Sequence, residues 1–325
     1  MLSAATLLLG LILLLGGGAL LVRGASDIAA GYGVSPLVIG LTVVGFGTSA
    51  PELVVNVIGA AGGATDLAFG NVVGSNISNL ALVLGVAALM TPITIQSGLV
   101  RRELPLLLLG TTILTVMALD GILESRPPAI TRSDSIVLLL LFGIFIYTNV
   151  LDFVQAKRED RLLEELGDYP LGPTEQVSPW RWAITLGGMV MLFLGGNLTV
   201  DGAIDVARQL GVSATTIGLF VVAIGTSLPE LVTSIIAAMR KESDLALGNI
   251  IGSNLFNSLA VLPISGLVAP IEIPSGGVTD LVMSWVLAAI LVAVFFLGRA
   301  SLGRAMGALL LTTYAAYAFY RITVL

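Results

Sequence analysis

The residues of this chain that could do chemistry are two glutamates, each preceded by hydroxyl side chains and a proline in an apolar stretch. Glu52 ends the hexapeptide Gly47-Thr48-Ser49-Ala50-Pro51-Glu52, which returns 178 residues later, with one substitution, and ends at Glu230. From Gly40 to Asn79, 22 of 40 positions are identical to those from Gly218 to Asn257, so the chain contains an internal duplication. A carboxylate surrounded by hydroxyl oxygens is a combination that binds a hard cation.

Helical spacing places these groups on one face. Thr48 lies four residues before Glu52 and Ser49 three residues before it, so all three side chains can share one face of a helix. Pro51 removes a backbone donor and crowds the carbonyl four residues back, which would interrupt the helix and free carbonyls near Gly45 as acceptors. The second copy repeats the set with Ala223, Thr226, Ser227, Pro229 and Glu230.

The next apolar segment adds further oxygen ligands. Ser75 and Asn79 are four residues apart, and their counterparts in the second copy are Ser253 and Asn257. If the copies pack about a pseudo-two-fold axis, both polar faces meet near the membrane midplane. Calcium takes about six to eight oxygen ligands, so the carboxylates, amides, hydroxyls and freed carbonyls are sufficient for it. The hydroxyls and carbonyls would serve sodium.

Composition places these residues in a membrane. Of the 325 residues, 56% are hydrophobic and 11% are charged, and the mean hydropathy is +1.00, which is typical of a polytopic membrane protein. Cysteine and histidine are absent. Their absence excludes disulfides, thiolate or imidazole metal sites and histidine-based catalysis. The sequence contains no basic cluster of the kind that grips phosphates, so we expect no nucleic-acid partner.

Apolar segments long enough to span a bilayer, roughly 17–25 residues each, follow the duplication. They are predicted at 2–23, 36–60, 67–90, 104–119 and 135–154, and again at 182–207, 214–239, 244–268, 280–298 and 305–321. The first lacks the basic start of a signal peptide and is interpreted as a helix. Five helices per copy make the second copy enter from the opposite side. The predicted fold is an all-α polytopic membrane protein, with ten transmembrane helices as two inverted five-helix repeats and broken helices at the midplane.

The polar stretch between the copies predicts the domain organisation. We expect a first repeat at residues 1–155, a linker at 156–180 and a second repeat at 181–325, with the start of the linker extending the fifth helix. Eleven basic residues fall on the connections at one side of the membrane and four on those at the other. Because positive charge favours the cytoplasmic side, the linker is predicted to be cytoplasmic and both termini to lie outside.

The doubled motif also invites a comparison with known families. Gly47-Thr48-Ser49-Ala50-Pro51-Glu52 with Gly70-Asn71-x-x-Gly74-Ser75-Asn76-x-x-Asn79 resembles the α-repeats of the calcium/cation antiporter superfamily, most closely those of prokaryotic sodium/calcium exchangers. The resemblance extends to the ten-span layout. It implies antiport of Ca²⁺ for Na⁺ by alternating access, with Ca²⁺ exported. It also implies a prokaryotic plasma (inner) membrane protein with no enzymatic activity, no cofactor and no obligate protein partner, surrounded by lipid.

Carried over by position, the resemblance implies that Glu52 and Glu230 bind Ca²⁺ and Na⁺ alternately. The other ligands it implies are the side chains of Thr48, Ser49, Ser75, Asn79, Thr226, Ser227, Ser253 and Asn257, with the carbonyls of Gly45 and Ala223. Asn257 departs from the family, in which an aspartate often stands there. The two glutamates then carry the only formal charge. One Ca²⁺ or two Na⁺ would neutralise them, whereas a third Na⁺ would leave the site positive.

Other functions stay open on the residues alone. A proton- or potassium-linked calcium antiporter fits the same duplication, although the Gly-Asn-x-x-Glu-His pattern typical of the proton/calcium branch is absent. A cation channel would more naturally be a symmetric oligomer around a pore. A membrane scaffold would not need carboxylates at matching midspan positions. An intramembrane protease would need a catalytic dyad, histidine ligands or paired aspartates, which the sequence does not offer.

Overall fold

Long apolar helices make up most of the computed structural model, which describes residues 2–94, 102–123, 127–166, 178–210, 225, 227–296 and 301–324. Within these ranges, seven helical segments are long and apolar enough to cross a membrane. They are Ser3–Tyr32, Pro36–Ala61, Thr65–Met90, Arg132–Leu151, Pro179–Gln209, Ser243–Val268 and Gly277–Phe296. Three further helices overlap the remaining predicted segments, namely α6 (Leu104–Met117), α12 (Leu228–Met239) and α16 (Arg304–Val324). The all-α membrane fold predicted from the sequence is confirmed.

Several spans are composite, with a π-helical turn inside an α-helix. The second span consists of α2 (Pro36–Ile39), η1 (Gly40–Val44) and α3 (Gly45–Ala61), and the third of α4 (Thr65–Ile77), η2 (Ser78–Val83) and α5 (Leu84–Met90). In the second copy, α13 (Ser243–Phe256), η5 (Asn257–Val261) and α14 (Leu262–Val268) correspond to the third span. The uninterrupted helices are α1 (Leu2–Tyr32), α8 (Arg132–Leu166), α9 (Pro179–Gln209) and α15 (Gly277–Phe296), and a short helix, α7 (Asp120–Leu123), follows α6.

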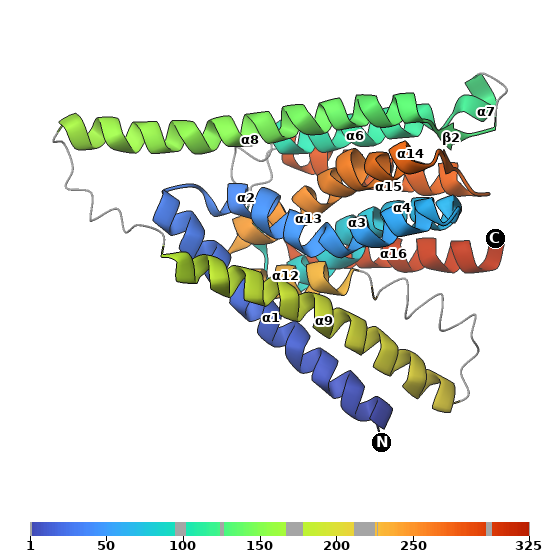
Figure 1. The fold of residues 1–325 in the computed structure, drawn as a ribbon, viewed down its shortest axis with the longest axis horizontal. Helices are drawn as coiled ribbons and strands as arrows, with labels where there is room; N and C mark the ends of the chain where they lie inside the picture. The colour runs from blue at the N-terminus through green and yellow to red at the C-terminus, as the bar shows by residue number, and fades with distance from the viewer. Residues whose placement is uncertain are drawn as a thin grey trace.

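The first helices of the two copies, α1 and α9, pack against each other along their length (Figure 1). The glycines at this contact recur every seven residues and match across the duplication: Gly10, Gly17 and Gly24 on α1, and Gly188, Gly195 and Gly202 on α9. Early residues of α1 meet late residues of α9, since Gly10 lies at Thr199 and Gly24 at Thr185. Equivalent helices therefore run antiparallel, which is the relation that an inverted repeat requires.

The centre of the protein is the span that begins with α13. Every residue from Leu245 to Phe256 is buried. A Cβ on Gly248 would lie 2.7 Å from the carbonyl oxygen of Leu37, and a Cβ on Gly45 would lie 3.0 Å from the backbone nitrogen of Ser253. The absence of side chains at these glycines lets the second span of the first copy touch α13 backbone to backbone. This contact brings the two duplicated motifs together.

Two short antiparallel ladders tie the copies together near the helix ends. β1 (Ile93–Thr94) pairs with β4 (Ser301–Leu302), in the register Ile93 to Leu302, and β2 (Ala129–Ile130) pairs with β3 (Ile271–Glu272), in the register Ile130 to Ile271. Each ladder joins one strand from each copy. The duplication relates β1 to β3, so the two ladders are themselves counterparts.

Pro51 does not break its helix as the sequence predicted, because α3 continues through it to Ala61. The irregularity lies about two turns earlier, in η1, where the N–H of Gly45 donates to the carbonyl of Gly40 five residues back. A π-turn inside an α-helix is a cause of bending separate from proline. In the second copy α12 begins at Leu228, so Pro229 lies in the first turn, where a missing N–H has no cost. At the predicted start of the linker, residue 156, α8 continues as a helix to Leu166.

Replacing Gly188 by valine tests the contact between α1 and α9. A Cβ at Gly188 would lie 2.6 Å from the backbone nitrogen of Leu21, so the helices must separate. Overpacking of this kind costs about 1–3 kcal/mol of unfolding free energy. Gly187→Val is the matched control, since no described atom lies within 4 Å of a Cβ there. Thermal unfolding in detergent should show a lower midpoint for Gly188→Val alone, and equal midpoints would contradict the contact.

Candidate cation-binding site

The first half of the candidate site lies on the buried face of α3. Thr48, Ser49 and Glu52 are each exposed by 2% or less. The three residues share one helical face, as their spacing predicted. The π-turn η1 comes directly before them, and π-turns inside α-helices are frequent at functional sites.

The two copies meet through their acidic motifs. The hydroxyl of Ser49 donates to Oε1 of Glu230 over 2.9 Å, which links α3 to α12. Glu230 is 1% exposed. Glu52 lies three residues after Ser49 on the same buried face of α3, so its carboxylate is on the side of this helix that faces Glu230. Two carboxylates from opposite copies therefore share one buried region.

A second cluster of oxygens forms around the carbonyl of Gly45. The hydroxyls of Thr48 and Ser253 each lie 3.3 Å from this carbonyl and 3.3 Å from one another. The Thr48 hydroxyl also lies 3.1 Å from Oδ1 of Asn249. A hydroxyl has one hydrogen to donate, so three oxygen neighbours cannot all be satisfied by it. Oxygens gathered in this way suit a hard cation.

Several buried polar atoms around this cluster have no hydrogen-bond partner within the described part of the chain. They include both carboxylate oxygens of Glu52, Oε2 of Glu230, the hydroxyls of Ser75 and Ser227, and the side-chain amides of Asn79 and Asn257. Each buried polar group left unpaired costs about 1–3 kcal/mol. The carboxylate, hydroxyl and amide oxygens of this set are ligand types that Ca²⁺ and Na⁺ accept, so these residues fit such cations.

The two predicted amide ligands lie at π-helical turns. Asn79 is the second residue of η2 and Asn257 the first residue of η5, and both side chains are fully buried. A π-turn disturbs the regular hydrogen-bond ladder and changes the direction in which the side chains point. Each amide therefore comes from an irregular turn in the span that follows its glutamate.

Most of the predicted ligands are found buried in these helices. Gly45, Thr48, Ser49, Glu52, Ser75, Asn79, Ser227, Glu230, Ser253 and Asn257 are all buried. Short polar contacts join Gly45, Thr48 and Ser253 in one group and Ser49 with Glu230 in another. Thr226 and Ala223 lie outside the described residues, so their positions stay a prediction.

Sequence reasoning assigned no role to Asn249, which joins the two halves of the site. Its Nδ2 donates to the hydroxyl of Ser234 over 2.9 Å and to the backbone carbonyl of Glu230 over 3.4 Å, while its Oδ1 faces Thr48. Asn249 thus connects α13 to both acidic helices. A signal for it was available, because the duplication preserves an asparagine at this position and at Asn71.

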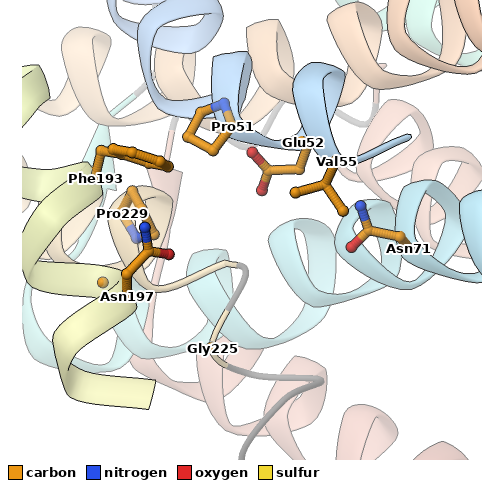
Figure 2. A pocket seen from close by; sticks show the side chains of 9 residues that line it. Pro51, Glu52, Val55, Asn71, Phe193, Asn197, Gly225 and Pro229 are labelled. Carbon is orange, nitrogen blue, oxygen red and sulfur yellow. The ribbon is translucent and has the colours of Figure 1, made fainter. Parts of the chain in front are cut away.

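A cavity of about 80 Å³ opens beside Glu52. Figure 2 shows the Glu52 side chain at this cavity, with Asn71 on one side and Asn197 and Phe193 of α9 on the other. A water molecule occupies about 30 Å³ in the liquid, so the space holds a cation with part of its hydration shell. Glu52 is the one ionisable side chain among the described residues that line this cavity.

Comparison with known proteins identifies the family of this chain. Residues 2–151 and 180–323 match the family described as sodium/calcium exchanger protein. The chain belongs to this family. The resemblance drawn from the doubled motif is thereby confirmed, and the fold is that of a transporter rather than of a catalytic enzyme.

Relatives and a solved structure agree with this exchanger assignment. The chain is 39% identical over 276 residues to the inner membrane protein YrbG of Escherichia coli, covering 84% of this chain and 82% of YrbG. It is 32% identical over 292 residues to the sodium/calcium exchanger MaX1 of Methanosarcina acetivorans, covering 82% and 83%. A structure of the sodium-calcium exchanger NCX_Mj aligns over 100% of this chain and 99% of its own, with a TM-score of 0.83 and 30% identity.

Glu52→Gln tests the unfavourable charge of the ion-free site. The substitution removes one of two repelling buried charges, so the protein in a chelator should unfold at a temperature a few degrees higher. Added Ca²⁺ stabilises the wild type by binding the folded state and should no longer stabilise the variant. Differential scanning fluorimetry with and without Ca²⁺ measures both effects. Glu272→Gln, at an exposed glutamate, is the control. A Ca²⁺-induced shift that survives in Glu52→Gln would contradict the assignment.

Proposed function

We propose that this exchanger moves Ca²⁺ out of the cell in exchange for Na⁺ across a prokaryotic plasma membrane, by alternating access to one site. The observation that carries the proposal is the hydrogen bond from Ser49 to Glu230, which joins the two acidic motifs. In this buried region both oxygens of Glu52 and Oε2 of Glu230 have no hydrogen-bond partner among the described residues. The proposed ligands are the predicted set, with Thr226 and Ala223 included by the symmetry of the duplication. Both termini are proposed to lie outside.

Electrostatics supplies the coupling between the ions. Two buried carboxylates are costly in a membrane unless cations neutralise them. The ion-free protein therefore does not pass between its inward-open and outward-open states, whereas protein holding Ca²⁺ or Na⁺ does. Ca²⁺ taken up on one side can leave on the other only when Na⁺ replaces it. This penalty produces exchange rather than leak.

The pair α1 and α9 is proposed to gate the site. α9 contributes Phe193 and Asn197 to the wall of the cavity beside Glu52, while the glycine contacts hold it antiparallel along α1. A shift of the pair along the other helices would close this cavity. The same shift would open the site on the opposite side, since the two copies are inverted.

Protons or potassium ions are the alternative coupling ions. A carboxylate such as Glu52 can carry a proton instead of a metal ion, and the hydroxyl and carbonyl oxygens around Gly45 can accept potassium. Among the relatives, MaX1 is named as a sodium/calcium exchanger, whereas one from Aphanothece halophytica, 26% identical over 249 residues, is named as a Ca²⁺/H⁺ antiporter. Transport assays separate the three possibilities.

Sodium coupling is tested in vesicles that contain the purified protein. Vesicles loaded with Na⁺ and diluted into Na⁺-free buffer should take up radioactive Ca²⁺, whereas a K⁺ or pH gradient should drive none. Glu52→Gln and Glu230→Gln should each lower the rate roughly thirtyfold or more, because each removes one of the two carboxylates that pair with the buried cation. Glu272→Gln should transport at the wild-type rate. Uptake that ignores the Na⁺ gradient would refute the sodium assignment.

Because Asn257 is uncharged, the site predicts how much charge moves in each transport cycle. Two glutamates are neutralised by one Ca²⁺ or by two Na⁺, so wild-type exchange should carry no net charge. A membrane potential of about 100 mV, worth about 2.3 kcal/mol per charge moved, should leave the wild-type rate unchanged. Asn257→Asp adds a third carboxylate and should make the rate depend on voltage, whereas Asn257→Ser should not. A voltage-dependent wild type would contradict this stoichiometry.

A further inference from the structure

The two predicted amide ligands, Asn79 and Asn257, occupy matching positions in the duplication but have different surroundings. Asn79 and Asn257 are counterparts in the duplication, but the residue before them is Ser78 in the first copy and Phe256 in the second. The last helix of each copy packs against one of these turns, α16 against η2 and α8 against η5. In Figure 1, α8 and α16 lie on opposite sides of the helices that carry the site.

The turn with Asn257 is held by aromatic packing. The ring of Phe256 stacks on Phe46 with centroids 4.6 Å apart and lies 5.9 Å from Phe142 of α8. Phe145 completes the group, with its centroid 6.2 Å from that of Phe142. These ring contacts have preferred geometries of their own and include no hydrogen bond to the turn.

The turn with Asn79 is held by hydrogen bonds. The hydroxyl oxygens of Ser78 and Tyr314 lie 3.2 Å apart. Tyr317, three residues along the same face of α16, donates its hydroxyl to Asp280 of α15, and Nε of Arg321 lies 3.1 Å from the same carboxylate. Two separate polar contacts therefore hold α16, one at the turn that carries Asn79 and one at the ion pair with α15.

The backbone of α16 is also fixed at its other end. A Cβ on Gly307 would lie 2.7 Å from the carbonyl oxygen of Gly85 in α5, so these helices touch without intervening side chains. Gly307 and Tyr314 hold α16 against α5 and η2 at two points, and Asp280 with Arg321 holds its far end against α15. Tyr314 is therefore presented to Ser78 from a rigid support.

We propose that Tyr314 is a positioning residue for the cation site and acts through Ser78 on Asn79. A π-turn lacks part of the regular backbone ladder, so its orientation needs support from outside the helix. Adjacent helix side chains point in different directions, and holding Ser78 toward α16 turns Asn79 away from it. Asn79 has no hydrogen-bond partner for its amide among the described residues, so the bond at Ser78 is what orients it. This inference rests on the proposed function, in which Asn79 binds the cation.

Calcium binding by the purified protein tests the proposal independently of transport. Isothermal titration should show that Tyr314→Phe raises the Kd for Ca²⁺ about fivefold, the loss expected for one hydrogen bond. The maximal transport rate should be kept while the KM rises. Ser78→Ala removes the other partner of the same hydrogen bond and should raise the Kd equally. The Kd of the double variant should equal that of either single variant. Tyr320→Phe, at a tyrosine exposed on the same helix, is the control.

The outcomes separate the two claims. Wild-type Kd and KM in both Tyr314→Phe and Ser78→Ala would overturn the positioning role and leave the proposed function standing. Losses that add in the double variant would also overturn it, because the two residues would then act separately. A wild-type protein that binds no Ca²⁺ would overturn the proposed function itself.

Discussion

Two carboxylates buried close together, on helices from opposite copies of a duplication, are the constraint on which the rest of this structure depends. In a membrane interior such a pair is unfavourable until a cation neutralises it. Everything around Glu52 and Glu230 supplies oxygen instead of counter-charge: hydroxyls of Thr48 and Ser253, the carbonyl of Gly45, and amides from two further turns. Neither copy holds the complete set. In the proposed function ions complete the site, which would link their binding to the stability and to the motion of the protein.

Close backbone contact makes this arrangement possible. Glycines without side chains let α13 touch the second span and let α1 lie along α9, so polar groups from both copies reach one another. The π-turns η1, η2 and η5 redirect the side chains that follow them. The supports of the two proposed amide ligands differ, with aromatic rings beside the turn of Asn257 and the Tyr314 hydroxyl at the turn of Asn79.

Much of this could be predicted from the sequence, for reasons that the structure makes clear. Helical spacing places Thr48, Ser49 and Glu52 on one face, and an odd number of spans per copy predicts the inversion seen in the antiparallel pair α1 and α9. The π-turns could not be predicted, because they depend on backbone hydrogen bonds rather than on side-chain pattern. Asn249 was missed because a buried asparagine has many possible partners and tertiary packing selects them. The two-residue strands are too short for any periodicity.

The most direct test of the central claim, that both copies build one shared site, is the number of Ca²⁺ ions bound by the purified protein. Isothermal titration in detergent should show one Ca²⁺ per chain, and Glu52→Gln and Glu230→Gln should each abolish its binding in the same concentration range. Two Ca²⁺ per chain, or wild-type binding in either variant, would show that the glutamates act separately and would contradict the shared site.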